Sequence, residues 1–293
     1  MRSRYGTAEL YGFDFAALAV ERIRELSRAS HQDMVCPFKP PQPGKPMPKC
    51  NKKGGVCSLR LFELNEQGKG EGKGGPVTTC PNRFLEGSLV AQWVGETLLG
   101  TSKPTVISEL PFLMREIQAE GADEDAVGKI DEVLVNAEGG ALRWCALEFQ
   151  AVYFSGKSME NDFKMMREWS GPGVPFPAVH RRPDFRSSGP KRLMPQLQIK
   201  VPTISRWGKK MAVVIDRAFW DSLSEMREVK DLSNCEIVWF VVSFAPAKDG
   251  RFALQRHETH CTTLDNAVEG LTGGTPMSLE RFEKQIRERL ARP

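Results

Sequence analysis

The chain has 293 residues, 40% of them hydrophobic and 27% charged, and is therefore long enough to bury a sizeable core. No window approaches about eighteen uninterrupted apolar residues and the N-terminus shows no secretory signal, so we expect a cytoplasmic protein without a membrane span. The formal net charge is only +4, but residues 36–60 carry +6 and residues 180–210 carry +8, which leaves −10 for the rest. Such concentrated positive charge favours a polyanionic partner.

The N-terminal third predicts one helix followed by two irregular segments. An amphipathic helix is expected over residues 15–26, where apolar side chains recur on one face at Phe15, Ala19, Ile23 and Leu26. Residues 36–57 contain six prolines and three glycines in 22 residues, which excludes a helix or an interior strand. Residues 67–75 read QGKGEGKGG and predict a flexible loop, because no strand precedes the glycines as a phosphate-binding loop requires.

The middle of the chain predicts a helix, three strands and another helix. Apolar side chains have helical spacing over residues 84–99, and Gly100 follows as a cap. Runs rich in β-branched or aromatic residues predict strands at 105–113, 128–136 and 143–154. A further helix is expected over residues 157–169, with its methionines facing inward.

The remainder of the chain extends this sheet. Residues 171–195 are proline-rich and basic and predict a surface loop. Apolar runs at 211–216 and 235–244 predict buried strands, and residues 279–290 predict a closing amphipathic helix. This alternation of strands and helices favours an α/β fold.

Three polar side chains on two of the predicted strands suggest an active site. Residues two apart on a strand face the same side, so Glu148 and Gln150 project together from a mostly apolar strand. Asp131 lies on the preceding strand, where a hairpin can bring it near Glu148. Grouped carboxylates suit Mg²⁺, which prefers oxygen ligands and can activate water beside a phosphoryl oxygen. The alternative is that these acids face solvent, as acids on amphipathic strands usually do.

The seven cysteines do not predict a disulfide framework, because their number is odd and no secretory signal is present. Four of them fall within 45 residues with the spacing C-x13-C-x6-C-x22-C, namely Cys36, Cys50, Cys57 and Cys80. The segment between them cannot build a core, so a tetrahedral four-cysteine site holding zinc or iron is expected to order it. This spacing lacks the paired CxxC motifs of ordinary zinc ribbons, so four unrelated thiols are the alternative.

The basic stretch that begins at His180 predicts contacts with DNA. Arginine can read guanine through two hydrogen bonds, and lysine can contact phosphates. We expect bases to be read from the part between His180 and Arg192, by Arg181, Arg182, Arg186 and Arg192. Phosphates are expected to be bound by Arg206, Lys209 and Lys210, and a solvated surface is the alternative. Should this stretch not bind DNA, the next candidates lie in the cysteine segment, at Lys49, Lys52 and Lys53.

Other possible motifs carry less information. The sequence HETHC, residues 257–261, superficially suggests a metal site, but a strand or turn with satisfied histidines is the preferred interpretation. No GxSxG, HExxH or GxxxxGK[ST] pattern occurs, so these hydrolase and nucleotide-binding motifs are excluded.

Six short motifs in the same order resemble the NotI family of type II restriction endonucleases, which belong to the PD-(D/E)XK superfamily. They are CPF at Cys36, CNKKGGVCSLR at Cys50, VTTCPNRF ending at Phe84, SELPF at Ser108, VGKIDEVLV at Val127 and ALEFQAVYFSG at Ala146. The resemblance implies a nuclease core with a central mixed sheet flanked by helices. It also implies Mg²⁺-dependent cleavage of GC-rich palindromic double-stranded DNA by a homodimer, a structural iron site formed by four cysteines, and a bacterial restriction–modification system.

The resemblance assigns roles to individual residues. Asp131 matches the first metal-binding acid and Glu148 the second, while Gln150 stands where most of the superfamily has lysine. Because an amide carries no charge, Gln150 is expected only to orient water or phosphate. A further family acid precedes Asp131, and Glu109 is preferred over Glu116 because it lies within a strand-like run. The structural metal ligands correspond to Cys36, Cys50, Cys57 and Cys80.

Two hypotheses follow for the whole chain. The first is a Mg²⁺-dependent site-specific endonuclease, and the second is a non-catalytic DNA-binding module on a decayed nuclease scaffold, suggested by the missing lysine. In both, residues 1–83 form an N-terminal helix and cysteine region, and residues 84–293 form the nuclease core, together making one compact unit.

Overall fold

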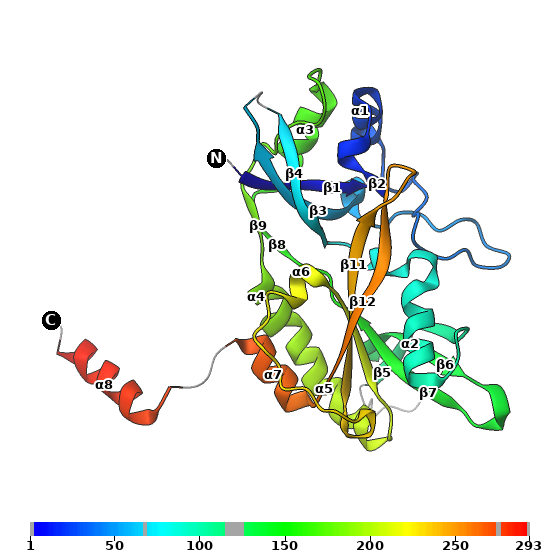
Figure 1. Ribbon diagram of the computed structural model, residues 1–293, viewed down its shortest axis with the longest axis vertical. Helices are drawn as coiled ribbons and strands as arrows, with labels where there is room; N and C mark the ends of the chain where they lie inside the picture. Colours follow the sequence, from blue (N-terminus) through cyan, green and yellow to red (C-terminus); the bar gives the residue numbers. More distant parts are fainter. Residues whose placement is uncertain (1–2, 67–68, 115–125, 274–276, 292–293) are drawn as a thin grey trace, which may run out of the picture.

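A computed structural model describes residues 3–66, 69–114, 126–273 and 277–291 (Figure 1). Two sheets dominate it, a six-stranded sheet in the lower half of the view and a four-stranded sheet in the upper half. A two-stranded sheet connects these halves. The family of folds predicted from the sequence, a mixed α/β arrangement, is confirmed.

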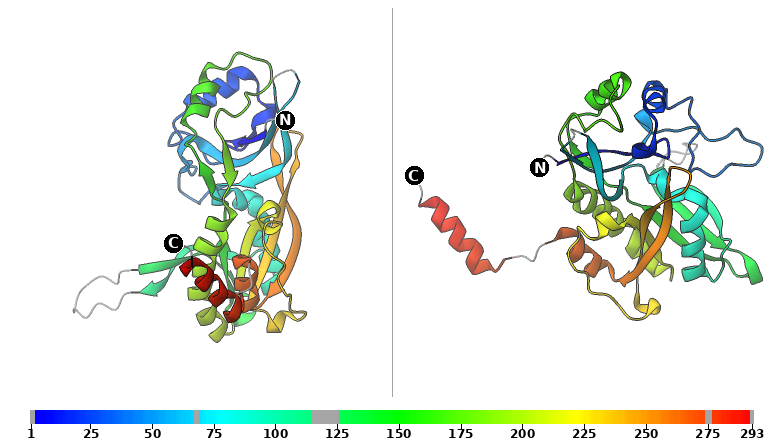
Figure 2. Two further views of the ribbon diagram at one scale, coloured as in Figure 1. Left: turned by 90° about the vertical axis from the view of Figure 1, so that its left-hand side faces the viewer. Right: turned by 45° about the horizontal axis from the view of Figure 1, so that its top comes forward.

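The six-stranded sheet has the order β12-β11-β10-β7-β6-β5. Its strands are β5 (Thr105–Met114), β6 (Ala126–Asn136), β7 (Arg143–Phe149), β10 (Met211–Asp216), β11 (Ile237–Pro246) and β12 (Phe252–Thr262). The central strands β7, β10 and β11 are parallel, while β5, β6 and β12 are antiparallel to their neighbours. Every residue of β10 is buried, as an apolar central parallel strand should be. The hairpin of β5 and β6 projects from the body (Figure 2).

Helices cover both faces of this sheet. One face packs against α5 (Met194–Arg206), α6 (Arg217–Trp220) and α7 (Leu264–Thr272), through buried side chains such as Leu197, Val201 and Phe219. The other face packs against α2 (Leu89–Leu99) and the 3-10 helix η3 (Pro81–Ser88), through Phe84 and Val94. The predicted helix over 84–99 is thus confirmed with a 3-10 start, and Gly100 ends it in the left-handed conformation, at φ 68°.

The four-stranded sheet has the order β2-β1-β3-β4. Its strands are β1 (Ser3–Leu10), β2 (Phe13–Asp14), β3 (Val56–Leu64) and β4 (Gly70–Thr78). Helices α1 (Val20–Arg28) and α3 (Glu160–Glu168) pack together on it, with the 3-10 turns η1 (Phe15–Ala17) and η2 (Lys53–Gly55) at its margins. The single helix predicted over 15–26 is therefore only partly right, because Leu18 and Ala19 are extended and separate the 3-10 turn η1 from α1.

Two segments predicted as loops are regular. Residues 70–75, within the glycine-rich run, belong to edge strand β4. Their glycines have little intrinsic preference for a strand, and backbone pairing with β3 holds them in one. Residues 67–68 of that run lie outside the described part. The basic segment 171–195 contains β9 (Arg181–Pro183), which pairs with β8 (Phe154–Gly156), then α4 (Phe185–Ser188) and the π-helical turn η5 (Gly189–Leu193). These turns lead directly into α5.

The C-terminal helix α8 (Leu279–Leu290) forms as predicted but stands apart from the body (Figures 1 and 2). Its apolar side chains are exposed, at Leu279, Phe282, Ile286 and Leu290. Among the described helices, none has the length and apolar character needed to cross a membrane. The remaining short elements are η4 (Glu138–Gly140) and η6 (Leu232–Asn234).

Candidate functional site

Three acidic residues lie in one row across neighbouring strands of the six-stranded sheet. The register places Glu109 of β5 opposite Asp131 of β6, and Asp131 opposite Glu148 of β7. The backbone N–H of Asp131 donates to Glu148 Oε1 over 3.4 Å, and the N–H of Phe149 donates to Asp131 Oδ2 over 3.0 Å. The structure therefore brings Asp131 and Glu148 together, as the hairpin in the sequence predicts.

Glu109 differs from the other two acids in its exposure and its backbone. Its side chain is 75% exposed, and Oε2 lies 3.2 Å from Lys129 Nζ. Its φ is +54°, a left-handed conformation that a residue with a long side chain rarely adopts within a strand. Such conformations concentrate at functional sites, where the surrounding structure holds them. Glu116, the other candidate for this acid, lies outside the described residues.

The charges of the acids interact. Burial raises the pKa of Glu148 to about 7, with a further contribution from the charge of Asp131. Burial also raises the pKa of Asp131, and the charge of Glu109 adds to it. Glu132, on the opposite face of β6, has its pKa raised to about 7 by burial and then by Asp131. No sequence motif marks Glu132, and its role beside Asp131 was not expected from the sequence.

Gln150 follows Glu148 at the end of β7, and its amide is engaged locally. Nε2 donates to the carbonyl oxygen of Ala151 over 2.6 Å, and the backbone N–H donates to Val214 of β10 over 3.0 Å. The side chain is largely buried but lines the same cleft as Asp131. Glutamine is neutral and shorter than lysine, so position 150 provides neither a positive charge nor a side chain as long as that of lysine.

A buried cation, Lys200, lies beside these acids and was not expected from the sequence. Lys200 of α5 is 5% exposed, and its Nζ lies 2.5 Å from Glu148 Oε1 and 3.0 Å from Gln196 Oε1. The signal was available in the sequence, because Lys200 falls on the apolar stripe of α5 with Leu197 and Ile204. No element was predicted between the loop ending at residue 195 and the strand beginning at residue 211, so this helical stripe was not considered; α5 has one proline in its first turn, where proline is tolerated, and Pro202 inside it.

A cleft of ≈ 1470 Å³ runs over this site between the cysteine segment and the six-stranded sheet. On one side it is lined by Glu109, Asp131, Glu132 and Gln150. On the other sides it is lined by basic residues, namely Lys39, Lys45, Lys52, Lys53, Lys157, Arg181 and Arg192. The tertiary structure therefore places the two basic stretches of the sequence around one row of acids.

A comparison with known protein families settles what this arrangement belongs to. Residues 20–254, most of the chain, match the family described as restriction endonuclease NotI. The chain belongs to the NotI restriction endonuclease family. It is accordingly a type II restriction endonuclease, a site-specific deoxyribonuclease that binds double-stranded DNA. A comparison with curated proteins gives no match.

The basic residues predicted to contact DNA in this NotI-family chain occupy two regions. Arg192 lines the cleft, with its guanidinium 3.4 Å from the centre of the Tyr153 ring, and Arg182 and Arg186 are exposed nearby on β9 and α4. Arg206, Lys209 and Lys210 lie near the start of β10, at the far end of α5. The 13 residues of α5 lie between the two regions, and a helix of that length spans about 20 Å.

Arg181 is held by the protein itself. Its side chain is buried, pairs with Asp162 and donates to the carbonyl oxygens of Lys157 (3.0 Å) and Ser158 (2.9 Å). These contacts fix β9 against the start of α3. Lys210 is likewise engaged, because its Nζ donates to the carbonyl oxygens of Ser233 and Cys235.

The four N-terminal cysteines of the family motifs are all buried. An isolated bridge between Val35 and Lys49 sets Cys36 beside Cys50, and the N–H of Cys80 donates to the carbonyl oxygen of Cys57 over 3.1 Å. Burial raises the pKa of Cys80, and the charges of Cys36 and Cys50 contribute. Within the described residues, however, no group of three or more His, Cys, Asp or Glu side chains has a metal-binding arrangement.

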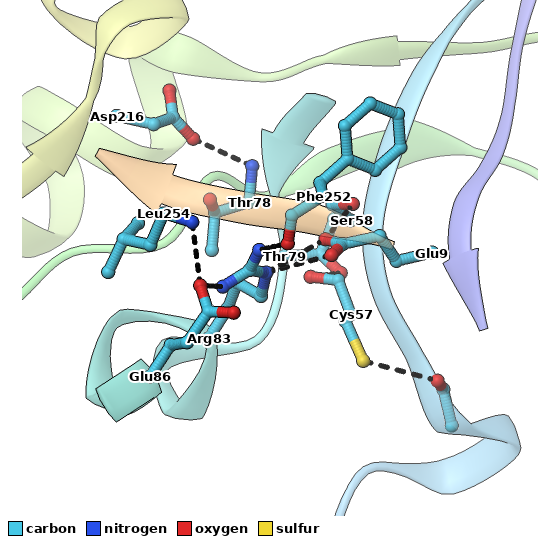
Figure 3. A network of polar contacts seen from close by, with 11 residues as sticks. Glu9, Cys57, Ser58, Thr78, Thr79, Arg83, Glu86, Asp216, Phe252 and Leu254 are labelled. Atoms are coloured by element: carbon cyan, nitrogen blue, oxygen red, sulfur yellow. Dashed lines mark hydrogen bonds and ion pairs between the residues drawn. The ribbon is translucent and has the colours of Figure 1, made fainter. Parts of the chain in front are cut away.

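A buried network ties the cysteine region to the nuclease sheet (Figure 3). The guanidinium of Arg83 donates to both carboxylate oxygens of Glu9 on β1, over 2.9 and 3.0 Å, and to Glu86 over 2.8 Å. It also donates to the carbonyl oxygen of Phe252 on β12, over 2.8 Å. Because β1 and β12 belong to different sheets, this contact holds the two sheets together.

The HETHC sequence lies in strand β12, as the preferred interpretation predicted. His260 Nδ1 is 2.8 Å from Glu228 Oε1, and its ring stacks on Trp220 with the two centres 4.1 Å apart. These contacts engage Nδ1 and the ring face, whereas the buried Nε2 lies 3.6 Å from Glu258 Oε2 and makes no hydrogen bond within the described residues, so the expectation of satisfied histidines holds only in part.

Proposed function

We propose that this NotI-family enzyme is a Mg²⁺-dependent endonuclease that cleaves a GC-rich palindromic site in double-stranded DNA. The observation that carries the proposal is the row of Glu109, Asp131 and Glu148 under a cleft with basic walls. An acidic site surrounded by positive charge can hold a cation and a phosphodiester at once. A decayed nuclease scaffold that only binds DNA would not need to keep these acids together.

The residues present fit a hard divalent cation. Asp131 and Glu148 supply carboxylate oxygens, the ligand type that Mg²⁺ prefers, and the charge of Asp131 acts on Glu148 to raise its pKa. Bound there, Mg²⁺ would activate water and stabilise charge on the phosphate. The strained, exposed Glu109 is the third acid of the proposed site, because its charge already acts on Asp131.

The other residues of the site bind and orient. Gln150, beside Glu148, would orient water or a phosphate oxygen by hydrogen bonding. Lys39, Lys45 and Lys53 face the cleft from the cysteine segment and would contact phosphates. Arg192, Arg182 and Arg186 are our candidates for reading guanine, because they are exposed at the cleft or near it.

The remaining basic residues have separate proposed roles. We keep Arg206 and Lys209 as candidates for phosphates outside the cleft, at the far end of α5. The internal partners of Arg181 and Lys210 make structural roles the better proposal for these two residues.

A palindromic target presents two identical half-sites, so we infer a homodimer in which each chain cuts one strand. Its place would be a restriction–modification system of the bacterial cytoplasm.

We further propose that Cys36, Cys50, Cys57 and Cys80 hold one structural iron or zinc ion. Two backbone contacts set the cysteines in pairs, and the charges of Cys36 and Cys50 add to burial in raising the pKa of Cys80. A cation would relieve this repulsion and order a segment that has little regular structure of its own.

The test replaces the acids one at a time. Asp131→Ala and Glu148→Ala are expected to lower the cleavage rate by several decades while DNA binding persists, because each removes a proposed metal ligand. Glu71→Ala, at an exposed acid outside the cleft, is the matched control. Discrete fragments from a plasmid incubated with Mg²⁺ support the enzyme, and sequencing the fragment ends identifies the site. A gel shift without cleavage by the wild type would support the binding module instead.

A further inference from the structure

A buried lysine on α5 stands behind the acidic row. Lys200 is nearly inaccessible, yet lysine is almost never buried unless its charge is paired. Its neighbours on the helix, Leu197, Val201 and Ile204, are completely buried in the core and fix the backbone that carries it. The ammonium group therefore occupies a position that the fold determines, rather than one chosen from many rotamers on a surface.

The partners of this ammonium group lie in the proposed active site. Glu148 Oε1 accepts from Nζ over 2.5 Å and from the backbone N–H of Asp131 over 3.4 Å, so one oxygen joins the lysine to the acid row. Gln196, one turn earlier on α5, accepts from Nζ over 3.0 Å and lines the cleft. Lys200 itself does not line the cleft, so it acts on the site through Glu148.

The position that would carry a cation in the superfamily is neutral here. Gln150 directs its amide to the carbonyl oxygen of Ala151, within its own segment. The two acids at the end of the sheet therefore receive no positive charge from β7. Lys200 instead brings a positive charge to the Glu148 carboxylate from α5.

We propose that Lys200 is the active-site cation of this nuclease, a positioning residue that holds the Glu148 carboxylate and supplies from α5 the charge absent at Gln150. The proposal rests on the proposed function, because it assigns Glu148 to the reaction. It requires the positive charge at Lys200, and not merely a side chain of that volume. A structural role alone would require only that the space be filled.

Lys200→Met keeps the length of the side chain and removes its charge. We expect kcat to fall by about 100-fold or more, as when one fixed electrostatic contact is removed from an active site. KM and the metal-free Kd for DNA are expected to stay within about 3-fold, because Lys200 does not face the cleft. Gln198→Met, at an exposed position of the same helix, is the control.

Placing a positive charge at position 150 in the Lys200→Met variant tests directly whether the charge of Lys200 is what the site requires. Gln150→Lys in the Lys200→Met background places an ammonium group on β7, and we expect it to restore at least about 10-fold of the lost kcat. Wild-type kcat in Lys200→Met overturns the proposal. An equal loss of kcat and of DNA affinity also overturns it, as does a folded, DNA-binding double variant without recovery.

A measurement without metal separates this proposal from the proposed function. Lys200→Met leaves Glu148 buried without its cation, so we expect a lower thermal midpoint than the wild type. Glu148→Gln/Lys200→Met removes both charges, and its midpoint is expected to recover by about 3 °C or more. This double variant also provides folded protein if the single variant unfolds. Absence of coupling overturns the pairing, whereas wild-type protein that never cleaves DNA with Mg²⁺ overturns the proposed function alone.

Discussion

Arg83 provides a stringent test of how the cysteine region is attached to the nuclease sheet. The side chain is completely buried and joins Glu9 of β1 to the carbonyl oxygen of Phe252 of β12. Its guanidinium also lies over the rings of Phe38 and Phe244, 4.4 and 4.7 Å from their centres. Replacement by methionine fills part of the space with an unbranched apolar side chain and removes the charge and all hydrogen bonds of the guanidinium.

The size of the effect follows from what the substitution leaves behind. Without Arg83, the hydroxyl of Ser58, 2.6 Å away, is the one hydrogen-bonding side chain that the described part of the chain leaves to the buried Glu9 carboxylate. Glu86 retains the backbone N–H of Leu254 and is partly exposed, so it contributes less. Breaking a buried ion pair in this way costs about 3–5 kcal/mol. We therefore expect Arg83→Met to lower the free energy of unfolding by about that amount.

Urea unfolding followed by tryptophan fluorescence and circular dichroism measures this change. Glu9→Gln and the double variant Glu9→Gln/Arg83→Met complete a thermodynamic cycle, and the double variant should lose about 1–3 kcal/mol less than the two single losses summed. The control is Arg217→Met, which removes an exposed ion pair with Asp221 over 3.3 Å and should cost less than about 1 kcal/mol. A loss below about 1 kcal/mol for Arg83→Met, or strictly additive losses, would refute the reasoning.

Three further predictions concern the buried acid Asp216, the cysteines and the DNA surface. Burial raises the pKa of Asp216 to about 6, above its ordinary value of 3.8, so its contribution to stability is greatest at low pH and is lost as the pH rises through 6. The free energy of unfolding of the wild type minus that of Asp216→Asn should therefore fall by up to about 3 kcal/mol between pH 4 and pH 7, and a constant or rising difference contradicts this. Freshly purified protein should contain one iron or zinc per chain by elemental analysis, and Cys57→Ala should lose it and expose residues 36–57 to proteolysis, whereas metal-free wild type excludes the structural site. Lys53→Ala should weaken binding to all DNA sequences alike and reduce the salt slope by about one, while Lys209→Ala, at the far end of α5, should change the slope less; the reverse result would move the DNA out of the cleft.

Local sequence patterns were sufficient for most of the regular structure. The apolar run 211–216 became the completely buried strand β10, because a central parallel strand needs apolar side chains on both faces. The hairpin between the strands of Asp131 and Glu148 was expected to bring these two acids close, and the backbone N–H of Asp131 does donate to Glu148 Oε1. Six short motifs were sufficient to indicate the family, which the match over residues 20–254 confirmed.

What the sequence left open depends on contacts between distant segments. The glycine-rich run 70–75 has no intrinsic preference for a strand, and it becomes one only because β3 offers a free edge. No helix was predicted over the residues of α5, so Lys200 was counted as basic surface although it is buried against Glu148, 52 residues earlier in the chain. Charge counting likewise could not separate Arg181, which is buried and paired with Asp162, from Arg192, which is exposed at the cleft. Burial and ion pairing of a charged side chain are set by whatever the fold packs against it, and only the tertiary structure decides that.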